Sequence, residues 1–141
     1  EGLCIAIENR RPAYYFACTN GGKAKRGQVW KLVPGAGGDT LSLFVESTGE
    51  AHFDMVDNLV AAPWGDIIFS EDGGGENFVR GVTPSGHVYP IARNAMNDSE
   101  ICGPCFSPDG TTLFFNVQRP GVTYAVTGPW AALARAARAA S

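Results

Sequence analysis

The amino-acid sequence predicts an all-β protein, specifically a partial β-propeller of about three four-stranded antiparallel blades whose last blade is incomplete. Composition is the first indication: 18 Gly and 9 Pro stand in short turn-like clusters, 18% of residues are charged and 11% are aromatic, which favours short strands over long helices. A unit that recurs about every 45–55 residues is the second, because this period is typical of propeller blades. The third is the nearly unbroken apolar character of the first two strands of each unit, as expected for strands covered on both faces.

The first copy of the repeat begins with a hairpin. Residues 2–9, GLCIAIEN, and residues 13–22, AYYFACTNGG, flank a predicted turn at Arg10-Arg11-Pro12. A third strand is predicted over 27–34, GQVWKLVP, and a fourth over 41–47, LSLFVES. Together these segments predict one four-stranded antiparallel blade.

The second copy follows the same plan. Its hairpin spans residues 57–75, DNLVAAPWGDIIFSEDGGG, with the turn predicted at Pro63-Trp64-Gly65. The segment FVRGVTPSG at 78–86 supplies the third strand, and HVYPIAR at 87–93 supplies the fourth. This copy therefore predicts a second complete blade.

The third copy predicts only three strands. Residues 100–121, EICGPCFSPDGTTLFFNVQRPG, form a hairpin that turns at Pro108-Asp109-Gly110, and GVTYAVTG at 121–128 adds one more strand. Because closed propellers typically need four to eight blades, we expect residues 1–130 to be the C-terminal blades of a larger propeller, or one arc of an assembly. The Ala/Arg-rich residues 131–141 are predicted to be a helical or disordered tail.

The CGPC sequence at residues 102–105 has the spacing of a redox dithiol or of half a zinc site. A redox dithiol needs a helix N-terminus to lower its thiol pKa, but turn residues and the β-branched, aromatic segment 111–115 follow Cys105. Zinc needs a second ligand pair, and Cys4 and Cys18 have no CxxC or HxxxH partner nearby. We therefore predict small buried cysteines on an inner strand, with redox catalysis, structural zinc and a Cys4–Cys18 disulfide as the alternatives.

Charge and hydropathy exclude several classes of function. The net charge of −3 argues against a nucleic-acid surface, and no apolar run approaches the ~20 residues of a membrane span. No P-loop or dinucleotide-binding sequence is present, so no nucleotide cofactor is expected. The sequence starts with Glu rather than Met and shows no signal peptide, which indicates a processed or truncated chain.

Polar residues recur at equivalent positions of the three hairpins. In an antiparallel hairpin the start of the first strand and the end of the second lie at the same edge, so residues at these two places become neighbours. If the first strand of each blade lies nearest the propeller axis, all of them surround one mouth of the central channel. The residues at these places are Glu1 and Asn20 in the first copy, Asp57, Asn58, Glu71 and Asp72 in the second, and Glu100 and Asn116 in the third.

Carboxylate and amide oxygens on the glycine-rich loops TNGG and SEDGGGEN suit Ca²⁺, which binds hard oxygen ligands. Gathered carboxylates would also repel one another without a cation. The alternative for each residue is a solvated turn position, because Asp and Asn are enriched in turns for local reasons. The one basic cluster, Lys23, Lys25 and Arg26, is either a contact for an anionic ligand or a solvated loop.

Three runs of the sequence resemble the C-terminal region of the PhoX-type alkaline phosphatases and their bacterial relatives. The runs are RGQVWKL, DNLVAAPWGDIIFSEDGGGENFVRGVTPSGHVYPIARN and SEICGPCFSPDGTTLFFNVQRPGVTYAVTGPW. The resemblance, which covers residues 1–130, implies a β-propeller with a Ca²⁺/Fe³⁺ cluster at one end of its channel that hydrolyses phosphate monoesters. It also implies an exported protein, located in the periplasm or secreted.

The resemblance assigns roles to individual residues. Glu1-Gly2 is similar to a metal-binding Glu-Gly step, and the other matching metal positions are Asp57, Asn58, Glu71, Asp72 and Glu100, with Asn20 as a weaker match. Glu1, Glu71 and Glu100 would lie nearest the phosphate as catalytic ligands. Lys23 or Arg26 would contact the substrate. The family's iron-binding cysteine belongs to earlier blades, and none of the four cysteines here matches it.

Two functional hypotheses follow. The first is a fragment of a metal-dependent phosphomonoesterase, whose own activity is uncertain because only part of the site is present. The second is a non-catalytic, Ca²⁺-binding propeller fragment that acts as a binding or structural module. Three blades would leave blade faces uncovered, so the missing blades or self-association are the expected partners besides the substrate.

Overall fold

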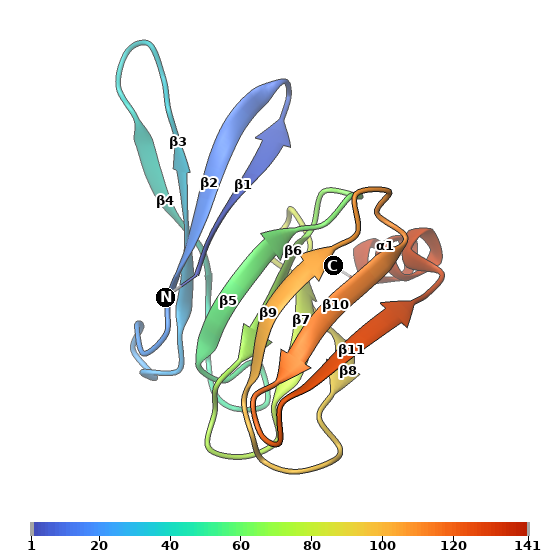
Figure 1. The fold of residues 1–141 in the computed structure, drawn as a ribbon. Helices are drawn as coiled ribbons and strands as arrows, with labels where there is room; N and C mark the ends of the chain where they lie inside the picture. Colours follow the sequence, from blue (N-terminus) through green and yellow to red (C-terminus); the bar gives the residue numbers. More distant parts are fainter. Residues whose placement is uncertain (1, 141) are drawn as a thin grey trace.

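The computed structural model describes residues 2–140 as three antiparallel sheets and one helix (Figure 1). Blade 1 has the strand order β1 (Leu3–Glu8), β2 (Arg11–Cys18), β3 (Gln28–Val33), β4 (Thr40–Glu46). Blade 2 has the order β5 (Val56–Ala61), β6 (Ile67–Glu71), β7 (Phe78–Val82), β8 (Val88–Arg93). Blade 3 has β9 (Ile101–Phe106), β10 (Thr112–Val117) and β11 (Val122–Thr127), and helix α1 (Trp130–Ala139) follows it. The predicted all-β fold with an incomplete last blade is confirmed.

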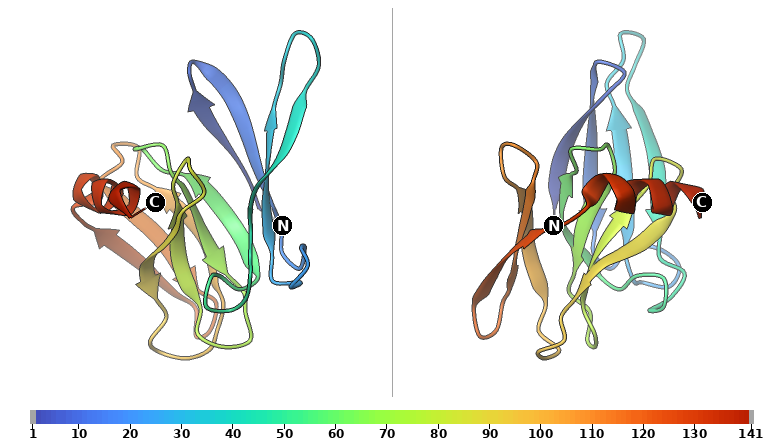
Figure 2. Two further views of the ribbon diagram at one scale, coloured as in Figure 1. Left: turned by 180° about the vertical axis from the view of Figure 1, so that it is seen from behind. Right: turned by 90° about the vertical axis from the view of Figure 1, so that its right-hand side faces the viewer.

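The blades stack face to face, with blade 2 between blades 1 and 3 (Figures 1 and 2). The first strand of each blade contacts the first strand of the next, since β1 contacts β5 and β5 contacts β9. This arrangement is the one expected of adjacent propeller blades, whose first strands line the axis. It places the first strands of the three blades side by side along one edge of the stack.

Strand β6 forms the centre of the core because all five of its residues are buried. Phe69 faces blade 1 and packs edge to face on Phe53, with ring centroids 5.2 Å apart. On the opposite face of the strand, Ile68 packs with Leu113 and Phe115 of blade 3. Each buried side chain of this kind contributes about 1.5–3 kcal/mol of transfer free energy, so β6 stabilises two blade interfaces at once.

The hairpin turns differ in one place from the prediction. The first turn consists of Asn9 and Arg10, which have φ angles of 48° and 65°, and Glu8 pairs directly with Arg11. Two consecutive residues with positive φ fit the two-residue turns that match strand twist. Arg11 and Pro12 therefore belong to β2 rather than to the turn, and the predicted turn at Arg10-Arg11-Pro12 is wrong by about one residue at its start.

The CGPC sequence lies within strand β9 and contains a β-bulge. Cys102 pairs with Asn116 and Cys105 pairs with Phe114, so one extra residue is inserted between the two cysteines. Gly103 adopts φ +61°, a conformation that glycine tolerates best, which explains its place in the bulge. The bulge turns both thiols to the same face of blade 3, and all four cysteines are free.

Helix α1 is anchored to the β5–β6 and β9–β10 hairpin turns of blades 2 and 3. Its Ala134 and Ala137 are buried, and Trp130 stacks on Trp64 with ring centroids 5.6 Å apart. Arg138 donates to the fully buried Asp66 over 3.0 Å. No helix within residues 2–140 has the length and apolar character needed to cross a membrane.

Replacing Trp130 by alanine tests this anchor. The substitution removes the Trp64 stack and the 2.8 Å hydrogen bond from the Trp130 indole to the carbonyl of Thr111. We expect the free energy of unfolding to fall by about 2 kcal/mol in chemical denaturation. Arg135→Ala on the exposed side of the same helix should change it by less than about 0.5 kcal/mol, and equal effects of the two variants would contradict the anchor.

Candidate metal centre

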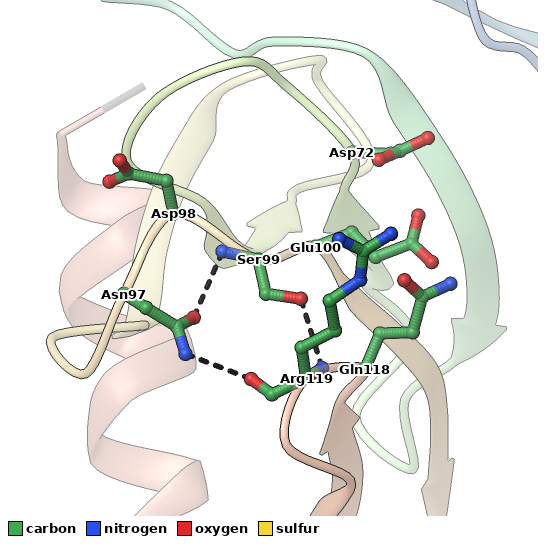
Figure 3. Close-up of a pocket in the computed structure, with 7 residues that line it drawn as sticks. All are labelled: Asp72, Asn97, Asp98, Ser99, Glu100, Gln118 and Arg119. Carbon is green, nitrogen blue, oxygen red and sulfur yellow. Dashed lines mark hydrogen bonds between the residues drawn. The ribbon is translucent and has the colours of Figure 1, made fainter.

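One end of blades 2 and 3, here called the mouth, contains a pocket of about 510 Å³ (Figure 3). Its volume lies in the range of small-molecule sites. Two carboxylates of the predicted set, Asp72 and Glu100, line it from different blades. The full lining is Asp72, Asn97, Asp98, Ser99, Glu100, Gln118 and Arg119. Three acidic residues and one basic residue give this pocket a negative charge.

Backbone hydrogen bonds fix these residues at the hairpin ends. The amide of Asp72 donates to the carbonyl of Met55 over 2.9 Å and so extends the β5–β6 pairing by one step. The amide of Gln118 likewise donates to the carbonyl of Glu100 over 3.1 Å, just beyond the β9–β10 pairing. The amide of Arg119 donates to the hydroxyl of Ser99, which ties the loop before β9 to the end of β10. Ordinary hairpin geometry therefore carries Asp72 and Glu100 to the mouth.

Asp57 and Asn58 lie in an irregularity of strand β5, where the register shifts between Val56 and Leu59. The carboxylate of Asp57 is buried and accepts a 3.2 Å hydrogen bond from the side-chain amide of Asn58. The side-chain oxygen of Asn58 in turn accepts a 2.8 Å hydrogen bond from the backbone amide of Gly103. Asn58 thus joins blade 2 to the bulge of blade 3 and orients Asp57.

Three carboxylates act electrostatically on the thiol of Cys102. Burial raises its pKa, and the negative charges of Glu100, Asp57 and Asp72 raise it further, because each disfavours the thiolate. These carboxylates come from the open ends of two adjacent hairpins, β5–β6 and β9–β10. Within residues 2–140, however, no three His, Cys, Asp or Glu side chains come close enough together to hold a metal ion.

Glu71 points away from this cluster, into the interface between blades 1 and 2. Its carboxylate is fully buried, forms an ion pair with Arg80 and accepts backbone N–H groups of Asp54 over 3.1 Å and Phe78 over 2.9 Å. Burial raises the pKa of Glu71, while Arg80 and the amide donors act in the opposite sense. Both oxygens already have protein donors, as expected of a structural ion pair.

The remaining predicted residues lie elsewhere. Asn20 is exposed on the β2–β3 loop, and Lys23 is exposed with its backbone amide donating to Glu46 over 3.1 Å. Arg26 is bound by two carboxylates, Asp54 at 2.8 Å and Glu50. Glu1 lies outside the described residues. Of the predicted set, Asp72 and Glu100 line one pocket, and Asp57 is hydrogen-bonded to Asn58.

Two functional features were not predicted from the sequence. One is the ion pair of Arg80, a charged residue between apolar neighbours in FVRGV, which indicates a buried partner, here Glu71. The other is Arg119, whose position depends on how the loop before β9 meets the end of β10. Only the first of these left a signal in the sequence.

Face-to-face antiparallel blades with carboxylates at one mouth define an arc of a β-propeller with a candidate cation site at the channel end. A family model, alkaline phosphatase PhoX, matches residues 6–121. Because this match covers most of the chain, the protein belongs to the PhoX alkaline phosphatase family. The family comprises metal-dependent phosphatases that are generally extracytoplasmic. A search of curated proteins found no significant match.

Gly2 is packed so tightly against the site that it tolerates no side chain. A Cβ atom on Gly2 would lie 2.6 Å from the carbonyl oxygen of Asp57 and 2.8 Å from the Cα atom of Asn58. We expect Gly2→Ala to lower the free energy of unfolding by about 1–3 kcal/mol in chemical denaturation, because backbone atoms cannot move aside cheaply. Gly37→Ala, where a Cβ atom meets nothing within 4 Å, is the control and should be close to neutral. Equal stability of the two variants would contradict the packing.

The reactivity of Cys102 tests the proximity of the carboxylates. In a Cys105→Ser background, Glu100→Gln should lower the pKa of Cys102, because it removes one of the charges that disfavour the thiolate. Alkylation by iodoacetamide at a fixed pH below that pKa should then be faster by about threefold or more, measured by mass spectrometry. Glu76→Gln removes an exposed carboxylate and should leave the rate unchanged. An unchanged rate in Glu100→Gln would place Glu100 away from the thiol.

Proposed function

We propose that this chain is part of a metal-dependent phosphomonoesterase whose cation site is at the mouth. Membership of the PhoX family over residues 6–121 is the observation that carries this proposal. The pocket that Asp72 and Glu100 line together from adjacent hairpins supports it. Three blades are fewer than a closed propeller needs, so the chain would supply one arc of the complete channel. The family context favours a periplasmic or secreted location.

The donor set suits the cations that the family resemblance implies. Asp57, Asp72 and Glu100 offer hard carboxylate oxygens, which are suitable ligands for Ca²⁺ and Fe³⁺. Bound cations would polarise the phosphoryl group of a monoester and activate the nucleophile. Glu100 would be the ligand nearest the substrate because it lines the open pocket, whereas Asp57 is buried. Asn58 would act as a positioning residue for Asp57.

A cationic side chain in the same pocket would contact the phosphate. Arg119 lines the pocket with Asp72 and Glu100, and Figure 3 shows its side chain extending toward Glu100. Lys23 is on the β2–β3 loop of blade 1, and Arg26 is already bound by two carboxylates. We therefore assign substrate contact to Arg119 in preference to these two residues.

Glu71 is assigned a structural role in this proposal. Arg80 and two backbone amides satisfy its carboxylate inside the blade 1–blade 2 interface. Removing one partner of such a buried pair generally costs about 3–5 kcal/mol. A Glu71 variant would therefore lose activity through unfolding alone, so its stability has to be measured in parallel with its activity.

A non-catalytic Ca²⁺-binding module is the alternative. The dispersed ligands of the single chain favour it, because no three-ligand group is formed among the described residues 2–140. A structural Ca²⁺ site would raise the melting temperature without any turnover. Metal binding and hydrolysis therefore have to be measured on the same preparation.

The test is hydrolysis of p-nitrophenyl phosphate with and without added Ca²⁺ and Fe³⁺, together with metal analysis of the purified chain. We expect metal-dependent turnover that a chelator abolishes and that Glu100→Gln lowers by about 100-fold, because a ligand or its support is lost. Glu76→Gln, which removes an exposed carboxylate paired with Arg93, is the matched control and should retain activity. Bound Ca²⁺ without turnover would support the module instead, and neither metal nor turnover would contradict both functions.

A further inference from the structure

The loop that connects blade 2 to blade 3 is held by buried asparagines rather than by apolar packing. Residues 94–100 join β8 to β9, and the largest apolar side chain among them, Met96, is 51% exposed. Asn94 and Asn77 are buried, with exposed fractions of 7% and 0%. Buried polar side chains are generally hydrogen-bonded, and the partners of these two lie in the loops at the mouth. The conformation of this loop therefore depends on two side-chain amides.

Asn94 organises the loop from the end of β8. Its side-chain oxygen accepts the backbone amide of Met96 over 3.0 Å and that of Asn97 over 3.4 Å. Its side-chain nitrogen donates to the side-chain oxygen of Asn97 over 3.0 Å and to the carbonyl of Ser99 over 2.9 Å. Local side-chain bonds of this kind give the backbone an alternative to helix or sheet pairing. One buried side chain therefore places both Asn97 and Ser99.

Asn97 and Ser99 hold the backbone of Arg119 on both sides (Figure 3). The hydroxyl of Ser99 accepts the amide of Arg119 over 3.0 Å, and the side-chain amide of Asn97 donates to the carbonyl of Arg119 over 2.9 Å. The amide of Ser99 also donates to the side-chain oxygen of Asn97 over 2.9 Å. Both polar groups of the Arg119 backbone are therefore bound by the loop before β9.

The guanidinium of Arg119 is left available for a ligand. Arg119 is the basic residue among those that line the pocket, and within residues 2–140 its guanidinium has no hydrogen-bond acceptor. Ordering a side chain or loop when a ligand binds weakens the affinity, and a group ordered beforehand avoids this cost. Fixing the backbone of Arg119 therefore favours anion binding while its charged donors stay unoccupied.

Asn77 connects the same loop to the part of the pocket that Asp72 lines. Its side-chain oxygen accepts the amide of Gly73 over 2.7 Å, and its side-chain nitrogen donates to the carbonyls of Gly73 over 3.1 Å and Asp98 over 3.2 Å. The backbone carbonyl of Asn77 accepts the amide of Asn94 over 2.9 Å. Because Gly73 directly follows Asp72, the two asparagines set the separation between Asp72 and the loop.

We propose that Asn97 and Ser99, organised by Asn94, are positioning residues that place Arg119 for contact with the phosphoryl group of the substrate. This inference rests on the proposed function, because that proposal assigns the phosphate to this pocket. Asn97 and Ser99 act through the Arg119 backbone and need not touch the phosphate themselves. The loop between the blades thereby has a role in substrate binding that none of its residues would show as a metal ligand.

Binding of phenylphosphonate, a monoester analogue that cannot be hydrolysed, tests the inference without requiring turnover. With Ca²⁺ present, isothermal titration calorimetry on the intact chain should show binding that Arg119→Ala abolishes. Ser99→Ala and Asn97→Ala each remove one hydrogen bond to the Arg119 backbone and should each raise the Kd by about threefold to tenfold. Ser99→Thr keeps the hydroxyl and should bind more tightly than Ser99→Ala. The matched control is Ser85→Ala, which removes a hydroxyl bonded to Thr83 at the opposite end of blade 2.

Hydrogen exchange separates positioning from a merely structural role. The amide of Arg119 should exchange about threefold to tenfold faster in Ser99→Ala than in the wild-type chain, because its acceptor is lost. A structural role alone would speed this exchange and leave the Kd for phenylphosphonate at its wild-type value, and that result would overturn the proposal. A wild-type chain that binds no phenylphosphonate, or a Ser99→Thr variant as weak as Ser99→Ala, would overturn it too.

The phosphatase proposal is tested separately by turnover of p-nitrophenyl phosphate. Metal-dependent turnover together with a wild-type Kd in Ser99→Ala and Asn97→Ala would reject the positioning role and leave the phosphatase proposal intact. The expected pattern of Kd values without turnover would support the positioning of Arg119 and count against catalysis by this chain. The two failures are therefore distinguishable.

Discussion

Face-to-face packing of blade 2 between its neighbours is the constraint on which the rest of the structure depends. Both faces of strand β6 are buried: Phe69 packs against blade 1, and Ile68 packs against blade 3. This double burial sets the spacing and the order of the blades. The positions of the hairpin ends, and therefore of the polar residues they carry, follow from it. The candidate site is a product of blade packing rather than of any single motif.

The link between blades 2 and 3 shows how the fold positions chemistry. The bulge at Gly103 presents a backbone amide to Asn58, and Asn58 holds the carboxylate of Asp57. The CGPC sequence contributes to the site through its glycine and through the bulge rather than through a dithiol. Its thiols lie on the outer face of blade 3. Burial and the negative charges of nearby carboxylates raise the pKa of Cys102 there. A sequence that suggests redox chemistry thus has a structural and electrostatic role here.

Much of the fold could be predicted because the repeat, the apolar inner strands and the turn residues all indicate the same arrangement. The predicted first turn starts one residue late because Asn9 and Arg10 take positive φ angles, for which the sequence gives little indication. Asp72 and Glu100 could be placed together from hairpin geometry combined with the expectation that the first strand of each blade lies nearest the axis. The role of Glu71 differs from theirs because side chains alternate between the two faces of β6. This alternation places Glu71 on the same face as Phe69 and beside Arg80. Long-range contacts, such as Gly103 with Asn58, depend on tertiary packing and leave no local pattern.

The central claim is that carboxylates from adjacent hairpin ends bind a cation at the mouth. A crystal structure grown with Ca²⁺ present, with the ion identified by anomalous scattering, tests it most directly. The account predicts a cation coordinated by Glu100 and Asp72, with Asp57 still held by Asn58 and Glu71 still paired with Arg80. A mouth without a cation, or a cation bound by Glu71 in place of Arg80, would contradict it.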